Sequence, residues 1–200
     1  MFRALFVALP FVLTAAAHAT PWVADEAHTN IGFTVKHMMV TDVRGTFDKY
    51  SVTIDADEKD VTKSKITVKI DPASINTRNA KRDEHLRSAD FFDVAKFPEL
   101  TFTSTKIEKM KDGKLAITGD LNMHGVKKSV VLNADAISDE YKDPWGGMHR
   151  GTKATLTINR EDFGLKWNKT LDKAGGLLVG KDVVIDIQVE LMPAPPPAKT

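Results

Sequence analysis

From Trp22 to Leu191 the chain alternates apolar and polar residues at every second position, in about eight separate stretches. Such alternation is typical of strands that bury one face and expose the other. It favours antiparallel strands, because parallel strands covered on both faces read as continuous apolar runs. The pattern therefore predicts a mainly β protein, with strands near residues 31–36, 50–55, 65–70, 100–103, 115–123, 128–134, 154–158 and 183–191.

Turn signals separate these stretches. Asp112-Gly113 is typical of a hairpin turn, His124-Gly125 reverses the chain, and residues 143–147 form a longer turn. About eight strands with one buried face each must either close into a barrel or pair as two sheets. A barrel of this size leaves room for one ligand, whereas a tightly packed sandwich leaves none. The pattern alone does not separate these two architectures.

The alternation stops between Asn76 and Pro98. Residues 80–87 are good helix formers without Gly or Pro, and Asn79 is a suitable N-cap. We therefore predict one helical segment over about residues 79–96. The aromatic pair Phe91-Phe92 that follows the helix formers has two interpretations. The rings either pin a connecting loop to the core or form a lid over a ligand site.

The two ends of the chain differ from the rest. Residues 1–19 are typical of a secretory signal peptide, with Arg3, an apolar run too short to span a bilayer, and an A-x-A site. We predict cleavage after Ala19 and export of the remainder; the alternative is an uncleaved membrane anchor. The exported chain is predicted to form one domain over residues 20–192. The Pro-rich residues 193–200 are expected to be a disordered tail that cannot join a sheet.

Composition and charge narrow the class of protein. The chain has 200 residues, 42% of them hydrophobic, which suits one globular domain or a small pair. The formal net charge is +1 and there is no basic arm, so we expect no nucleic-acid partner. There are no cysteines, which removes disulfides, zinc–thiolate sites and cysteine nucleophiles together.

The sequence lacks the common motifs of catalysis. None of its histidines is paired at H-x-H or H-x-x-x-H spacing, so we predict no metal site, although one assembled from distant residues stays open. G-x-S-x-G, Walker and G-x-G-x-x-G sequences are absent too. We interpret Asp83, Glu84 and His85 as a solvated helix face. We therefore expect no catalytic residues, no catalytic cofactor and no enzyme activity.

The strands supply many apolar side chains that point inward. These either form a packed core or leave a cavity lined by part of the set. A cavity of roughly 300–1,000 Å³ would suit a single apolar ligand. The inward candidates are Phe33, Val35, Phe47, Phe102, Ile117, Leu121, Met123, Leu156, Ile158, Phe163 and Trp167.

Several segments carry a resemblance to a known family: FTVKHMMVTDVRGTFDKY, RDEHLRSADFFDVAKFPELTFTST, ITGDLNMHGVKKSVVL, DPWGG, INREDFGLKW and VVIDIQVE. On these segments the chain resembles the YceI-like family of secreted lipid-binding proteins, also described as polyisoprenoid-binding. The resemblance implies a single antiparallel, lipocalin-like barrel of about eight strands with one helical segment against it. It also implies a long isoprenoid or similar lipid inside the barrel. In this family the exported form is periplasmic and dimers are common.

The family pattern can be carried over by position. His37 either serves a polar lipid head or is a structural histidine, and Arg44 and Arg160 are interpreted as rim residues that pair with acids. The glycines of the pattern are more simply explained by turns or close strand approach. The pattern falls on His37, Arg44, Gly45, Phe47, Asp90, Phe91, Phe92, Pro98, Phe102, Gly119, Leu121, Gly125, Trp145, Gly146, Arg160, Phe163 and Gly164. Together with the inward candidates, it gives a predicted lipid pocket of Phe33, Val35, His37, Phe47, Phe91, Phe92, Phe102, Leu121, Met123, Leu156, Ile158, Phe163 and Trp167.

The preferred hypothesis is a periplasmic binding or carrier protein for a long-chain apolar lipid, such as an isoprenoid quinone or its precursor, held noncovalently. Expected partners are this lipid, a second copy of the chain, and transient contacts with the membrane or with membrane redox proteins. Two alternatives stay open. An enzyme acting on such a lipid would need titratable residues that converge inside the barrel. A stress-response interaction module without a lipid would have a solid interior.

Overall fold

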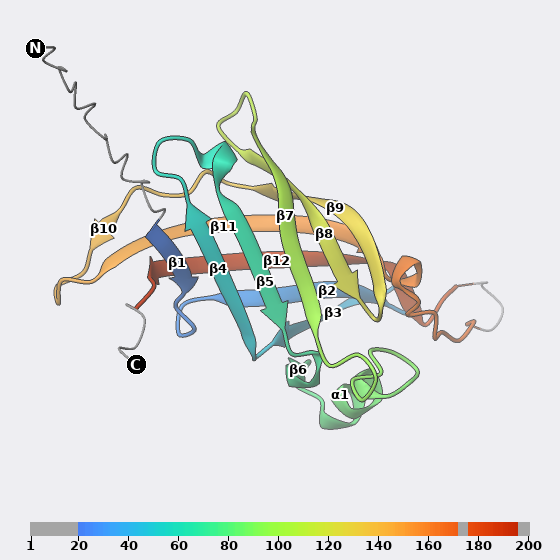
Figure 1. Ribbon diagram of the computed structural model, residues 1–200. Helices are drawn as coiled ribbons and strands as arrows, with labels where there is room; N and C mark the ends of the chain where they lie inside the picture. Colours follow the sequence, from blue (N-terminus) through green and yellow to red (C-terminus); the bar gives the residue numbers. More distant parts are fainter. Residues whose placement is uncertain (1–19, 172–175, 196–200) are drawn as a thin grey trace, which may run out of the picture.

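A computed structural model describes residues 20–171 and 176–195. Within them, strands in the order β11, β9, β8, β7, β5, β4, β1 and β12 form a ring, which closes because β12 pairs back to β11 (Figure 1). The pairings are antiparallel. The predicted mainly β fold, with an antiparallel barrel of eight strands, is thus confirmed, and closure decides between barrel and sandwich. The strands of this ring are β1 (Thr20–Ala24), β4 (Tyr50–Ala56), β5 (Lys65–Ile70), β7 (Leu100–Lys109), β8 (Leu115–Met123), β9 (Val126–Ala134), β11 (Met148–Asn159) and β12 (Val179–Pro193).

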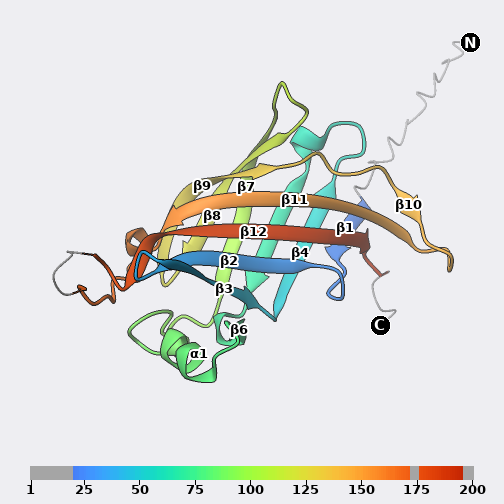
Figure 2. The same cartoon turned by 180° about the vertical axis from the view of Figure 1, so that it is seen from behind.

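The wall of the barrel is built differently at its two ends. At one end, β12 pairs with β1 through residues 191–193, and β1 pairs with β4. At the other end, β12 pairs with β2 (Asn30–His37), which continues to β3 (Thr41–Phe47) and β6 (Ile75–Asn76) (Figure 2). The short strand β10 (Tyr141–Lys142) adds to β11 outside the ring.

Buried and more exposed side chains alternate along the barrel strands, as the sequence predicts. On β8, Leu115, Ile117, Gly119 and Met123 are buried and their neighbours are more exposed. Gly119 has a steric reason, because a Cβ atom there would lie 2.3 Å from the ring of Phe102 on β7. The glycine therefore lets this large aromatic ring lie flat across the wall.

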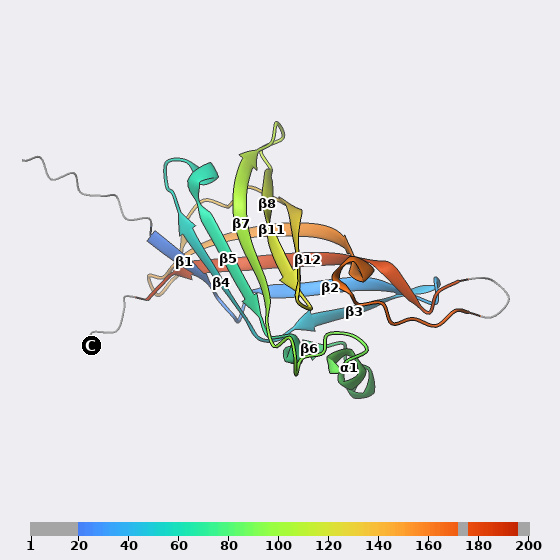
Figure 3. The same cartoon turned by 45° about the vertical axis from the view of Figure 1, so that its right-hand side comes forward.

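The helix α1 (Ala80–Arg87) lies outside the ring of strands, next to β6 (Figure 3). Asn79 is its N-cap and accepts a hydrogen bond from the Arg82 amide at 3.1 Å, as the sequence predicts. The helix ends at Arg87, and turns rather than helix follow to residue 96, so the helix itself is shorter than the predicted segment.

Polar contacts, more than apolar ones, hold α1 against the barrel. Asp83 is buried, and its carboxylate accepts hydrogen bonds from the Thr77 amide, at 2.9 Å, and from the Thr77 hydroxyl. Arg87 donates to the carbonyls of Ala73 and Ile75 at 2.7 and 2.8 Å. The interpretation of a solvated face was wrong for Asp83, because this residue satisfies the backbone that leads into the helix.

The ends of the chain add three observations. The predicted signal peptide lies outside the described residues, and β1 begins at Thr20. At the other end, Pro193 belongs to β12 and is the register partner of Trp22, so the sheet extends into the predicted tail by one residue. Residues 196–200 lie outside the described part.

Within residues 20–171 and 176–195, no helix has the length and apolar character that a membrane span requires.

Candidate functional site

An internal cavity of about 140 Å³ lies in the half of the barrel nearest α1. Facing strands supply its walls: Phe33 comes from β2, Phe102 from β7 and Leu121 from β8. Phe91 and Phe92, from the turns after α1, also line it. Arg160 is the single titratable side chain among the described residues that line this main cavity. The site is therefore apolar on nearly every side.

A second cavity of about 190 Å³ adjoins the first. The two share wall residues from β2, α1, the turns after α1, and β12, namely Phe33, Val35, Leu86, Phe91 and Val179. The second cavity is lined in addition by a polar rim, which we define as Lys36, His37, Thr77, Arg82 and His85. The lining thus changes from apolar in the main cavity to basic and polar in the second cavity, near α1.

Aromatic rings form the partition between the two cavities. The Phe91 ring lies 5.3 Å from the Trp167 ring, between centroids, and His85 packs edge-on against both, at 5.1 and 4.8 Å. On the inner side, Phe92 packs edge-on against Phe47 at 5.8 Å. These are ordinary aromatic pair distances. The turns after α1 therefore cover this end of the barrel mainly through ring contacts.

Arg160 is buried at the base of the site, with 4% of its surface exposed. Its guanidinium donates to the carbonyls of Gly180, at 2.8 Å, and of Leu165, and more weakly to Val179 at 3.4 Å. Burial lowers the pKa of Arg160. The expectation that Arg160 pairs with an acid was wrong, because its guanidinium donates to backbone carbonyls and so connects Leu165 with Gly180 of β12. Arg44, by contrast, is an exposed residue of β3.

The structure brings most of the predicted pocket residues together. Those that line the main cavity are Phe33, Val35, Phe47, Phe91, Phe92, Phe102, Leu121, Met123 and Ile158. His37 and Trp167 line the second cavity instead. Leu156 and Phe163 line neither: Leu156 packs against the core, and Phe163 is fully buried in it.

Sequence reasoning missed several lining residues, which are Ile31, Ile70, Ile75, Leu86, Leu100, Leu165, Val179, Val183 and Ile185. Most of them lie on strands whose alternation was visible, and Val183 and Ile185 share one face of β12. Alternation marks the inner face but does not distinguish packed positions from cavity positions.

Each cavity is smaller than the sequence-based expectation. Volumes of about 140 and 190 Å³ are below the roughly 300 Å³ at which small-molecule pockets usually begin. The large rings of Phe33 and Phe91 line both cavities, and the ring of Phe92 lines the main one. A ligand longer than a few carbons would need these rings to move.

Comparison with known proteins points to one family. The YceI-like domain family matches residues 22–191. A UPF0312 protein from Vibrio campbellii is 38% identical over 162 residues, which cover 80% of this chain and 83% of that protein. The crystal structure of a Campylobacter jejuni YceI protein has a TM-score of 0.67 and 36% identity, covering 86% of this chain and 96% of that chain. A polyisoprenoid binding domain from Saccharophagus degradans, implicated in plant cell wall breakdown, has a TM-score of 0.61. It covers 88% of this chain and 99% of its own, but at 17% identity it shows only that the fold is the same.

Proposed function

This chain belongs to the YceI-like domain family, and from that premise we propose that it is an exported binding or carrier protein for a long-chain apolar lipid. The lipid is held noncovalently inside the barrel and is an isoprenoid, such as a quinone or its precursor. The related fold of the Saccharophagus degradans polyisoprenoid binding domain supports this ligand class. The sequence of residues 1–19 supports export, and so a periplasmic location.

One observation carries the proposal. The main cavity is lined by apolar side chains and adjoins a second cavity that ends at the polar rim. A lipid tail in the main cavity would be stabilised by burial of apolar surface, at about 25 cal/mol per Å². Its polar head would remain beside Lys36, His37, Arg82 and His85, where hydrogen bonding is available.

Entry of a long chain requires the lid to move. We define the lid as residues 88–97, the turns between α1 and β7. Phe91 of the lid lines both cavities and Phe92 lines the main cavity, and both make ring contacts there. A lipid chain can replace these contacts with apolar contacts of its own, so opening exchanges one set of apolar contacts for another.

The surroundings of the main cavity favour binding over catalysis. Arg160 is the one titratable side chain that lines this cavity in the described chain, and backbone carbonyls already accept its hydrogen bonds. An enzyme that acted on the lipid tail would need an acid or base there. The histidines of the polar rim, His37 and His85, line the second cavity instead.

An exposed apolar turn lies beside the second cavity and supports transient membrane contact. Met38, Met39 and Val40 join β2 to β3 and are 44%, 61% and 82% exposed. The Met38 amide donates to the carbonyl of Leu178, which lines the second cavity. A membrane surface at this turn would therefore face the entrance that the proposal assigns to the lipid.

A series of polyprenols of increasing length tests the function. We expect affinity to rise by at least tenfold for each added isoprene unit. Burial of its five carbons contributes about 4 kcal/mol, at about 0.8 kcal/mol for each CH₂-sized group, and binding costs reduce this gain. The rise should stop when the chain outgrows the two cavities. Displacement of a fluorescent fatty-acid probe, below the solubility limit of each polyprenol, measures this. Affinities that do not depend on length would indicate adsorption to the surface and contradict an internal site.

A further inference from the structure

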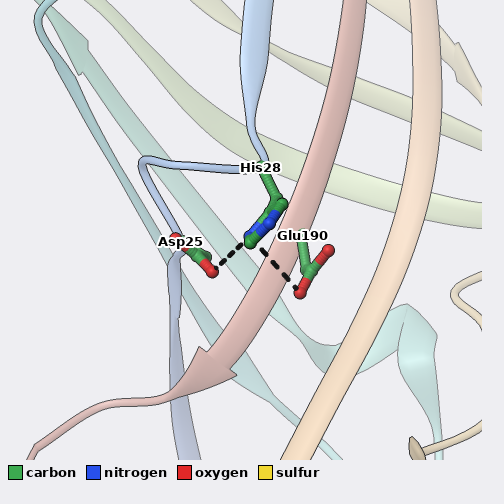
Figure 4. A group of neighbouring side chains, drawn as sticks. All are labelled: Asp25, His28 and Glu190. Carbon is green, nitrogen blue, oxygen red and sulfur yellow. Dashed lines mark hydrogen bonds and ion pairs between the residues drawn. The ribbon is translucent and has the colours of Figure 1, made fainter. Parts of the chain in front are cut away.

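A cluster of titratable side chains lies at the end of the barrel that is remote from the lid. Asp25 and His28 belong to the turn between β1 and β2, Glu190 to the end of β12, and His149 to β11 (Figure 4 shows the first three). Glu190 is separated from Val179, at the cavity end of β12, by about 35 Å of extended strand. The cluster is therefore independent of the proposed lipid site.

Three possible ligand atoms converge in this cluster. His28 Nδ1 lies 2.8 Å from Asp25 Oδ2 and 3.9 Å from Glu190 Oε1, and all three atoms lie within 4.8 Å of one another. Zinc bound to nitrogen and oxygen at 2.0–2.2 Å places neighbouring ligand atoms roughly 3.3 Å apart in a tetrahedron. The observed distances lie on both sides of that value, so small side-chain rotations would suffice.

The backbone holds these side chains in place. The Asp25 amide donates to the Glu190 carbonyl at 2.8 Å, and the Thr29 hydroxyl donates to the same carbonyl at 3.2 Å. The Glu190 amide in turn donates to the Thr29 hydroxyl oxygen at 3.1 Å. The turn is thus attached to β12 at the residue that supplies the third ligand atom, and little reorganisation would be needed.

His149 lies beside these three residues and holds Glu190. Its Nδ1 forms an ion pair with Glu190 Oε1 at 2.9 Å and is shielded from solvent. Partners that hold a ligating carboxylate in this way are common around metal sites.

Asp143 orients the His149 ring. His149 Nε2 lies 3.0 Å from Asp143 Oδ2, and the amides of Trp145 and Gly147 both donate to Asp143 Oδ1 at 2.8 Å. The arrangement directs Nδ1 toward Glu190.

The charge around the cluster favours a cation. In residues 20–171 and 176–195, the carboxylates of Asp25, Asp143 and Glu190 form ion pairs with His28 and His149 but with no lysine or arginine. Arg150 is near in sequence, but it pairs with Glu140 at 3.0 Å and stacks on Trp22. The carboxylates therefore give this end of the barrel a negative charge that would attract a metal cation.

We propose that Asp25, His28 and Glu190 bind a divalent transition-metal cation of the zinc class, with His149 as a positioning residue for Glu190. One imidazole nitrogen and two carboxylates, with water in the fourth position, suit zinc, whereas magnesium and calcium prefer oxygen ligands alone. The bound cation would connect the β1–β2 turn to β12, where β1 joins β12 through only three register pairs. It would therefore stabilise the closure of the barrel at this end.

Isothermal titration of the untagged chain from Thr20, stripped of metal with a chelator, tests this site with Zn²⁺. We expect one Zn²⁺ per chain with a Kd in the micromolar range or tighter, and much weaker binding of Mg²⁺. His28→Ala and Glu190→Gln should each weaken Zn²⁺ binding at least tenfold. Glu108→Gln, which removes an exposed strand carboxylate paired with Lys106, should leave it unchanged.

Two further readouts keep the test decisive. The His28 side chain is 64% exposed, so His28→Ala is expected to fold, which circular dichroism can verify. Zn²⁺ should raise the melting temperature of the wild-type chain but not of this variant. Binding of Co²⁺ should give the visible absorption of a tetrahedral site and lose it on His28→Ala. Equal Zn²⁺ affinity in the cluster variants and in Glu108→Gln, or no binding below millimolar concentration, would overturn the proposal.

Discussion

Replacing Phe92 with aspartate is expected to reduce lipid affinity by about 100-fold or more, because a buried carboxylate costs several kcal/mol. Phe92 lies on the lid, lines the main cavity and packs edge-on against Phe47. In the free protein the lid can turn the new carboxylate toward water, so the fold should survive. With lipid bound, the carboxylate must either enter apolar surroundings or hold the lid open. Displacement of the fluorescent probe by a polyprenol measures the loss.

Ala95→Asp is the matched control for this variant. Ala95 lies on the same lid but is exposed and lines neither cavity, so the added charge stays in water. We expect its lipid affinity to remain within about twofold of wild type, since surface substitutions usually have effects within about 0.5 kcal/mol. If folded Phe92→Asp binds polyprenol as tightly as Ala95→Asp, Phe92 does not contact the ligand.

Arg160→Met is expected to lower the free energy of unfolding by about 3 kcal/mol. The methionine fills similar space but donates no hydrogen bonds, so the carbonyls of Gly180 and Leu165 lose a charged donor. The Val179 carbonyl keeps another donor, the Asn168 side-chain amide at 2.8 Å. Two orphaned, buried carbonyls at about 1–3 kcal/mol each account for the expected loss. Urea unfolding followed by tryptophan fluorescence measures it.

Two companion variants separate charge from geometry at Arg160. Arg160→Lys keeps the charge but cannot reach both carbonyls with one ammonium group, so we expect most of the destabilisation to persist. Lys153→Met removes an exposed cation from β11, the strand that ends just before Arg160, and should change stability by less than about 0.5 kcal/mol. Full stability of Arg160→Lys would show that the positive charge, rather than the forked hydrogen bonding, is what this position requires.

The strands and the helix were largely readable from the sequence, because one buried face leaves a period-two pattern and Asn79 is a strong capping signal. The short strands were harder. In β3 a glycine, Gly45, occupies the buried position between Val43 and Phe47, where a Cβ atom would clash with the Phe33 ring. Close packing against Phe33 requires a glycine at this position, and the absence of a side chain weakens the apolar alternation in the sequence. β1 contains Pro21, which also reduces the strand signal.

The site was harder to predict than the fold. Alternation identified which residues point inward, but whether a cavity remains depends on the exact directions of rings such as Phe33 and Phe91. The burial of Asp83 and the carbonyl contacts of Arg160 depend on backbone groups that no residue pattern encodes. The cluster of Asp25, His28 and Glu190 was missed for a related reason. Glu190 is far from the other two in sequence, and the three meet because the turn between β1 and β2 is hydrogen-bonded to β12.

Native mass spectrometry of the chain purified from periplasm, without added lipid, tests the central claim most directly. The proposed function predicts a discrete adduct that organic extraction identifies as a polyprenyl-type lipid, with Phe92→Asp from the same preparation largely free of it. A bare mass for the wild-type chain, together with no uptake of added polyprenol, would contradict an internal lipid site.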